Sequence, residues 1–176
     1  MTFAPTQSAP SDDVCRWSLD VFVMEVDMSA AGKAGCRSCD ATLARVREAA
    51  DMLRPVFGIL DVDLNVSELR VSDLTQARAL GLRASPMIRI GGFDLYPEHQ
   101  GRTPDGADWF ETDRVWRWNG QTYDQPPTAM LIDALLRAYA QGGRSLRFEP
   151  AELPPYVRQF LERRKPAQPA SACGCG

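Results

Sequence analysis

The chain has 176 residues, of which 44% are hydrophobic and 24% charged, and its formal net charge is -3. These values are typical of one globular domain with extensions. They disfavour a nucleic-acid-binding protein, which usually carries a basic face, and no apolar run approaches the roughly 20 residues of a membrane span. The start of the chain also lacks the basic and apolar regions of a secretory signal. We therefore expect no nucleic-acid or membrane partner and a cytoplasmic location, where thiols stay reduced.

Apolar runs and turn residues predict the elements of the first part of the chain. Strands are expected at residues 19–26, 58–64, 87–90 and 93–96. Helical spacing of apolar residues predicts a helix that begins near Cys36 and ends at Pro55, because proline removes a backbone N–H. A shorter helix is expected over residues 73–80, with Ser72 as its N-cap.

A Trp-rich segment, residues 97–126, follows the predicted strands. Within it, Asn119-Gly120 predicts a β-hairpin that joins residues 114–118 to 121–123. A helix should start at Pro127, and a last short helix should cover residues 155–164.

The order of strands and helices predicts an α/β fold, a mixed sheet flanked by helices. We expect a disordered arm at residues 1–14, one domain at 15–143 with the inserted Trp-rich hairpin segment at 97–126, a C-terminal helical extension at 144–165 and a flexible cysteine-containing tail at 166–176.

Two of the five cysteines form a Cys-x-x-Cys pair, Cys36 and Cys39, at the predicted start of a helix. The helix N-terminus has free N–H groups and the positive end of the helix dipole, and both stabilise a thiolate on Cys36. The pKa of Cys36 should therefore lie below the value of about 8.5 of a free thiol. Cys39, one helical turn later, can attack a mixed disulfide formed by Cys36. This spacing in a cytosolic protein indicates redox or metal chemistry.

Ser85-Pro86 lies directly before an apolar strand and the Gly91-Gly92 turn, and this segment resembles the cis-Pro segment of thioredoxins and glutaredoxins. The chain is similar to a group of small bacterial thioredoxin-like proteins with a cysteine-rich tail. The resemblance implies a thioredoxin-like fold and a thiol–disulfide oxidoreductase, with Cys36 as attacking thiol and Cys39 as resolving thiol. It also implies that Ser85 and Pro86 contact the substrate, a disulfide-containing protein or small-molecule thiol, and that no cofactor is needed.

The sequence departs from the thioredoxin pattern at two points. Gly35 replaces the familiar Trp before the first cysteine, and the acid that the family buries near the dithiol has two candidates in this chain, Glu25 and Asp27.

A thiolate site for a soft metal is the rival interpretation. Cys36 and Cys39 together with Cys173 and Cys175 could hold zinc, copper(I) or a thiophilic metalloid. The same tail cysteines could instead exchange electrons with the dithiol, or they could be incidental. Cys15 is interpreted as a small apolar residue. Because His99 is the only histidine, a site with two histidine ligands is excluded.

Overall fold

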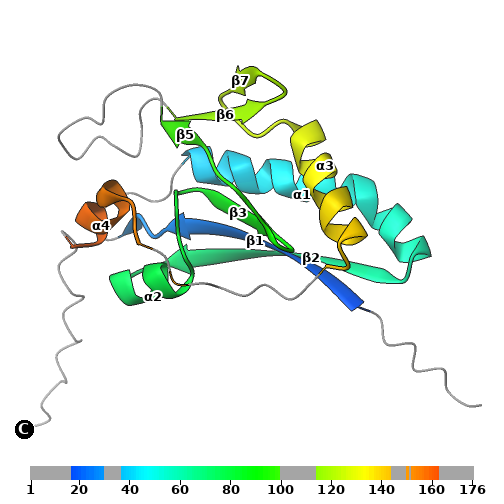
Figure 1. Ribbon diagram of the computed structural model, residues 1–176, viewed down its shortest axis with the longest axis horizontal. Coiled ribbons are helices and arrows are strands. Elements are labelled where there is room, and N and C mark those ends of the chain that lie inside the picture. The colour runs from blue at the N-terminus through cyan, green and yellow to red at the C-terminus, as the bar shows by residue number, and fades with distance from the viewer. Residues whose placement is uncertain (1–16, 30–36, 100–113, 144–149, 151, 163–176) are drawn as a thin grey trace, which may run out of the picture.

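The computed structural model describes residues 17–29, 37–99, 114–143, 150 and 152–162. Its elements are, in chain order, β1 (Trp17–Val26), α1 (Arg37–Ile59), β2 (Val62–Val71), α2 (Leu74–Ala79), β3 (Met87–Ile90), β4 (Phe93–Leu95), β5 (Glu98–His99), β6 (Arg114–Trp118), β7 (Gln121–Tyr123), α3 (Thr128–Ala140) and α4 (Pro155–Glu162). Four strands form a sheet in the order β2-β1-β3-β4 (Figure 1). β1 and β2 are parallel, whereas β1–β3 and β3–β4 are antiparallel. The predicted α/β fold, a mixed sheet flanked by helices, is therefore confirmed, and the arrangement is consistent with a thioredoxin-like domain.

The two faces of this sheet carry separate hydrophobic clusters. Successive side chains of a strand point to opposite faces, so that Leu19, Val21 and Val23 of β1 belong to one cluster and Met24 and Val26 to the other. The first cluster is completed by α1 and α3 and the second by α2 and α4. Figure 1 shows α1 and α3 together on one side of the sheet.

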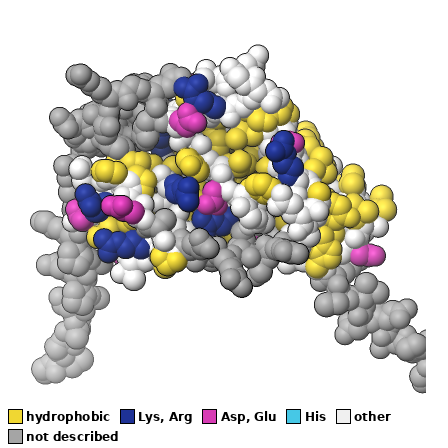
Figure 2. Space-filling model, in the orientation of Figure 1, with side chains coloured by type: hydrophobic (Ala, Val, Ile, Leu, Met, Phe, Trp, Pro, Cys, Tyr) yellow, Lys and Arg dark blue, Asp and Glu magenta, His cyan; other side chains and the backbone are white. Residues whose placement is uncertain are grey.

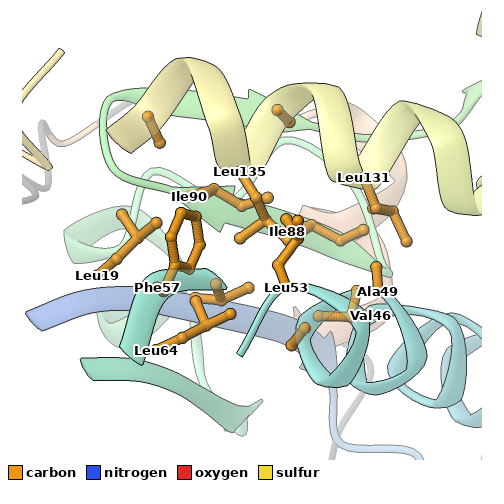
Figure 3. Packing of buried hydrophobic residues seen from close by; sticks show 14 of the residues in the cluster. Leu19, Val46, Ala49, Leu53, Phe57, Leu64, Ile88, Ile90, Leu131 and Leu135 are labelled. Carbon is orange, nitrogen blue, oxygen red and sulfur yellow. The ribbon is translucent and has the colours of Figure 1, made fainter. Parts of the chain in front are cut away.

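Phe57 of α1 lies at the centre of the first cluster and is fully buried. Its ring centroid is 5.5 Å from that of Tyr139 in α3. Figure 3 shows Phe57 between Leu19 and Ile90, and Leu131 and Leu135 reach down from α3 towards α1. Each such side chain contributes about 1.5–3 kcal/mol when it is fully buried, so this cluster fixes α1 on the sheet.

The prediction that Pro55 ends the helix is wrong, because α1 continues to Ile59 with Pro55 in its interior. Leu53 and Phe57 on either side of the proline are both buried in the first cluster. Their packing favours a continuous helix and outweighs the roughly 3 kcal/mol that an interior proline costs.

The second strand is also longer and starts later than predicted. Residues 58–59 belong to α1, and the chain turns at Asp61, which has a positive φ of 55°. β2 then runs in unbroken parallel register beside β1, from Trp17↔Val62 to Val26↔Val71. The pairing with β1 explains why the polar stretch 65–71, which carries little hydrophobic signal, is a strand.

The N-cap of α2 is Asp73 rather than the predicted Ser72. The Asp73 carboxylate accepts a hydrogen bond from the backbone N–H of Gln76 at 2.8 Å. We expect Asp73→Ala to lower the free energy of unfolding by about 1 kcal/mol, measured by urea denaturation. Ser72→Ala is the matched control, and a larger loss in that variant than in Asp73→Ala would contradict this assignment.

The Trp-rich segment contributes a second sheet in the order β5-β6-β7. The hairpin between β6 and β7 has the predicted strands and turn, and the two-residue strand β5 pairs with β6 in addition. Trp116 of β6 is only 1% exposed and belongs to the first cluster. The Trp-rich segment therefore packs on the main domain through Trp116.

Charged and apolar side chains are unevenly distributed over the visible surface. Figure 2 shows hydrophobic side chains gathered over α3 and the C-terminal half of α1. Met52, Val56 and Ile59 of α1 and Leu136 of α3 are among the large apolar side chains that are exposed.

The buried guanidinium group of Arg89 in β3 is paired with a carboxylate. Two of its nitrogens donate to the Asp94 carboxylate, and one nitrogen donates to the Leu80 carbonyl.

Candidate functional site

Cys39 lies in the first turn of α1 and is 1% exposed. Its Sγ is 3.9 Å from the Oγ of Ser85, in the loop before β3. The structure thus brings together two of the predicted site residues that are 46 positions apart in the chain. Cys36, Cys173, Cys175 and Cys15 lie outside the described residues.

The Ser85–Pro86 peptide bond is cis, as the resemblance to the cis-Pro segment of thioredoxins and glutaredoxins implied. Ser85 is 2% exposed, and its Oγ accepts a hydrogen bond from the backbone N–H of Val26 at 2.9 Å. Val26 is the last residue of β1. The end of β1 therefore holds the Ser85 hydroxyl beside the Cys39 sulfur.

Glu25 of β1 is the acid near Cys39. It follows the alternation of Leu19, Val21 and Val23, so it points to the α1 side of the sheet, and its side chain is only 12% exposed. Burial raises the pKa of Glu25, and a hydrogen bond with Cys39 opposes that rise. A raised pKa brings a carboxyl group closer to the range in which it can take up and release a proton during a reaction.

The other candidate, Asp27, lies beyond the end of β1. Its carboxylate accepts a hydrogen bond from the backbone N–H of Ser29 at 2.9 Å. Of the two acids, Glu25 is the one whose hydrogen bond with Cys39 the structure shows.

Glu25 is connected to the surface through two residues of β2. Arg70 is its partner in the parallel register, and Arg70 Nε is 3.4 Å from Glu25 Oε1. The same Nε is 2.6 Å from Oε1 of Glu68. The hydrogen bond from Arg70 lowers the pKa of Glu68, so Glu25 and Glu68 differ in the direction of their shifts and Glu25 is the carboxyl that holds a proton more readily.

Tyr156 of α4, which belongs to the second cluster, contacts the cis-Pro segment. It is not among the site residues that the sequence predicted. Its hydroxyl lies 3.5 Å from the Arg83 carbonyl and hydrogen-bonds with the backbone of Ser85. Burial raises the pKa of Tyr156 to about 12, so the phenol stays protonated at neutral pH. Its place in the predicted helix, next to apolar residues, could have indicated that Tyr156 is buried. A buried phenol usually has a hydrogen-bond partner.

Thr42 connects α1 to the segment before α3 through a hydrogen bond. It lies less than one turn after Cys39, is fully buried, and donates from Oγ1 to Gln125 Oε1 at 3.1 Å. The position of Cys39 is thus fixed by contacts of α1 with several elements.

The site combines a buried thiol, a carboxyl group with a raised pKa and a buried hydroxyl group. This set can transfer a proton between sulfur and carboxylate and can stabilise a thiolate. Within the described parts of the chain, no three residues among His, Cys, Asp and Glu come together as a group that could hold a metal ion.

Residues 26–135 match the family described as a domain of unknown function, DUF2703, and the chain belongs to this family. No curated protein and no solved structure matches the chain. None of the helices between residues 17 and 162 that the structure describes is long and apolar enough to cross a membrane.

Proposed function

We propose that this protein is a thiol–disulfide oxidoreductase that uses Cys36 and Cys39. The observation that carries the proposal is the position of Cys39, whose sulfur contacts both the segment with the cis-Pro86 peptide bond and the Glu25 carboxyl group. A structural thiol in an apolar core needs neither contact. Disulfide exchange uses both, since it requires a proton acceptor for the second thiol and a surface that binds the substrate.

The reaction begins with Cys36, which directly precedes the first residue of α1. Its thiolate attacks one sulfur of the substrate disulfide, a mixed disulfide forms, and the first substrate sulfur leaves as a thiolate that takes up a proton. Cys39 then passes its proton to Glu25 and attacks the Cys36 sulfur. The Cys36–Cys39 disulfide forms and the second substrate sulfur leaves, so two electrons pass from the dithiol to the substrate. An external thiol must then reduce the protein again.

The C-terminal tail is proposed as an internal thiol partner of this site. The contact of Tyr156 with Ser85 places α4 beside the cis-Pro segment, and α4 ends at Glu162. Cys173 follows only 11 residues later, and a chain can span at most about 3.3–3.6 Å per residue. Such a tether gives Cys173 and Cys175 an effective concentration on the order of millimolar, which favours exchange with Cys36 and Cys39 over exchange with a dilute partner.

A redox titration of the anaerobically purified full chain tests the proposal. We expect a reversible Cys36–Cys39 disulfide in glutathione buffers of graded potential, detected by alkylation and mass spectrometry, and reduction of a protein disulfide such as that of insulin. Zinc, copper and arsenic content is measured on the same sample. A chain that forms no such disulfide, or that carries one bound metal per molecule and loses thiol reactivity with it, would support the thiolate-site interpretation instead.

Replacement of both Cys173 and Cys175 by serine tests whether the tail cysteines take part in the reaction. We expect slower re-reduction of the Cys36–Cys39 disulfide by a dilute thiol, with the first substrate turnover unchanged. Deletion of residues 166–176 should act in the same way. Equal rates in all three chains would show that the tail cysteines take no part.

A further inference from the structure

Two polar groups, one half-buried and one buried, face the sulfur of Cys39. The Glu25 carboxyl group hydrogen-bonds with it from β1, and the Ser85 hydroxyl lies 3.9 Å away in the loop before β3. The carboxylate can only accept a hydrogen bond, so it favours the thiol form of Cys39. A thiolate at this position needs a donor, because burial without one disfavours the charged form.

The Ser85 hydroxyl has its proton available for the sulfur. Its oxygen already accepts the backbone N–H of Val26 at 2.9 Å. A hydroxyl group has one proton and two lone pairs, so the Val26 bond uses a lone pair and leaves the proton to point elsewhere. Cys39 Sγ lies within hydrogen-bond range of that oxygen and is itself buried.

We propose that the Ser85 hydroxyl donates a hydrogen bond to the thiolate of Cys39 and thereby makes the resolving thiol easier to ionise. This role deepens the oxidoreductase function proposed above and rests on it. It adds a catalytic task to Ser85, whose resemblance-based role is contact with the substrate. The residue contacts one of the two reacting sulfur atoms.

The support of Ser85 comes from two elements that do not carry the dithiol. Val26 at the end of β1 fixes the hydroxyl, and Tyr156 of α4 hydrogen-bonds with the Ser85 backbone. Both contacts orient the hydroxyl without competing for its proton. This preorganisation is what makes one donor effective towards a developing charge.

Several charged groups lie near Glu25, the carboxyl group that contacts Cys39. Asp40 in the first turn of α1, and Glu68 and Arg70 on β2, each interact electrostatically with Glu25. Three of these four side chains are acidic, so the net effect of these neighbours opposes a second negative charge. The Ser85 hydroxyl acts in the opposite direction.

The experiment measures the pKa of Cys39 directly. Cys15, Cys36, Cys173 and Cys175 are replaced by serine in the full chain, and the thiolate of Cys39 is followed by its ultraviolet absorbance as the pH rises. We expect Ser85→Ala to raise the pKa of Cys39 by about one unit, the size expected when a charged group loses one hydrogen-bond donor. Ser67→Ala, at an exposed serine of β2, is the control and should cause no shift.

A second pair of variants separates the hydroxyl group from the volume of the side chain. Ser85→Thr and Ser85→Val have nearly the same shape, and only threonine retains the donor. The pKa of Cys39 should be about one unit higher in the valine variant than in the threonine variant. This comparison decides the question if the alanine variant does not fold.

The outcomes distinguish this inference from the function on which it rests. Equal pKa values in the Thr and Val variants, or an unchanged value in Ser85→Ala, overturn the role of Ser85 even if the chain reduces disulfides. If the pKa shift has the expected size but the unmodified chain shows no disulfide reductase activity, the hydrogen bond is supported and the oxidoreductase function is rejected.

Discussion

Cys39→Ser should stop disulfide reduction after its first half and leave the substrate covalently attached to Cys36. The attacking thiol is intact in this variant, but no second thiol is present at position 39 to release the substrate. We expect multiple turnover to be lost and a mixed disulfide to accumulate with one substrate per chain. Mass spectrometry of the non-reduced protein, followed by peptide mapping, measures both the adduct and its attachment site.

Cys36→Ser and Cys15→Ser are the controls for this experiment. The first should lose turnover without forming an adduct, because the attacking thiol is missing, and the second should behave as the unmodified chain. An adduct on Cys39 in the Cys36→Ser variant, formed as fast as the adduct on Cys36, would reverse the assigned roles. Cys39 is 1% exposed, and this burial favours Cys39 as the resolving thiol and Cys36 as the attacking thiol.

Glu25→Gln should slow the release of the mixed disulfide by roughly a hundredfold at neutral pH, the low end of what a positioned proton acceptor contributes. Glutamine has nearly the same shape as glutamate but cannot take the proton from Cys39. Single-turnover kinetics separate this step from the first attack, which should be unaffected. The pH dependence of the release step should also lose the ionisation that belongs to Glu25.

The stability of the same variant should change with pH in a defined direction. Because burial raises the pKa of Glu25 above the model-compound value of 4.5, the folded state binds this proton more tightly than the unfolded state. Its stabilising contribution is full below pH 4.5 and is lost as the pH rises through the folded pKa. Urea unfolding should therefore show Glu25→Gln gaining stability relative to the unmodified chain as the pH rises from 4 to 7.

Glu68→Gln is the matched control, because its effect on the pH dependence of stability should have the opposite sign. The hydrogen bond from Arg70 lowers the pKa of Glu68, so the charged form is favoured in the folded protein and its stabilisation is present above pH 4.5. The effect is small because Glu68 is near the surface. A Glu68→Gln variant that slows resolution as much as Glu25→Gln would show that the two carboxyl groups act as a unit.

Local signals in the sequence predicted much of the fold correctly. The hairpin around Asn119-Gly120, the strands on either side of Gly91-Gly92 and the start of α3 next to Pro127 all follow from residues with restricted or unusual backbone preferences. These features depend on a few neighbouring residues, which is why the sequence alone determines them. The cis bond at Ser85–Pro86 was expected instead from the resemblance of this segment to the cis-Pro segment of thioredoxins and glutaredoxins.

Tertiary packing decided the features that the sequence predicted wrongly or left open. Pro55 stays inside α1 because Leu53 and Phe57 are anchored in the core, and β2 extends to Val71 because β1 pairs with its whole length. Both interactions join segments that are distant in the chain, and their combined free energy exceeds the local preference of one proline or of a few polar residues.

The site shows the same division. The sequence by itself determined the Cys-x-x-Cys pair and the helix that starts beside it, and the resemblance to thioredoxins pointed to the Ser85-Pro86 segment. Only the tertiary structure selected Glu25 over Asp27, placed the Ser85 hydroxyl beside the Cys39 sulfur and brought Tyr156 of α4 to the same loop. The pKa of a thiol or carboxyl group depends on burial and on the groups that surround it in space, and those neighbours come from β1, the loop before β3 and α4, which meet only in the folded chain.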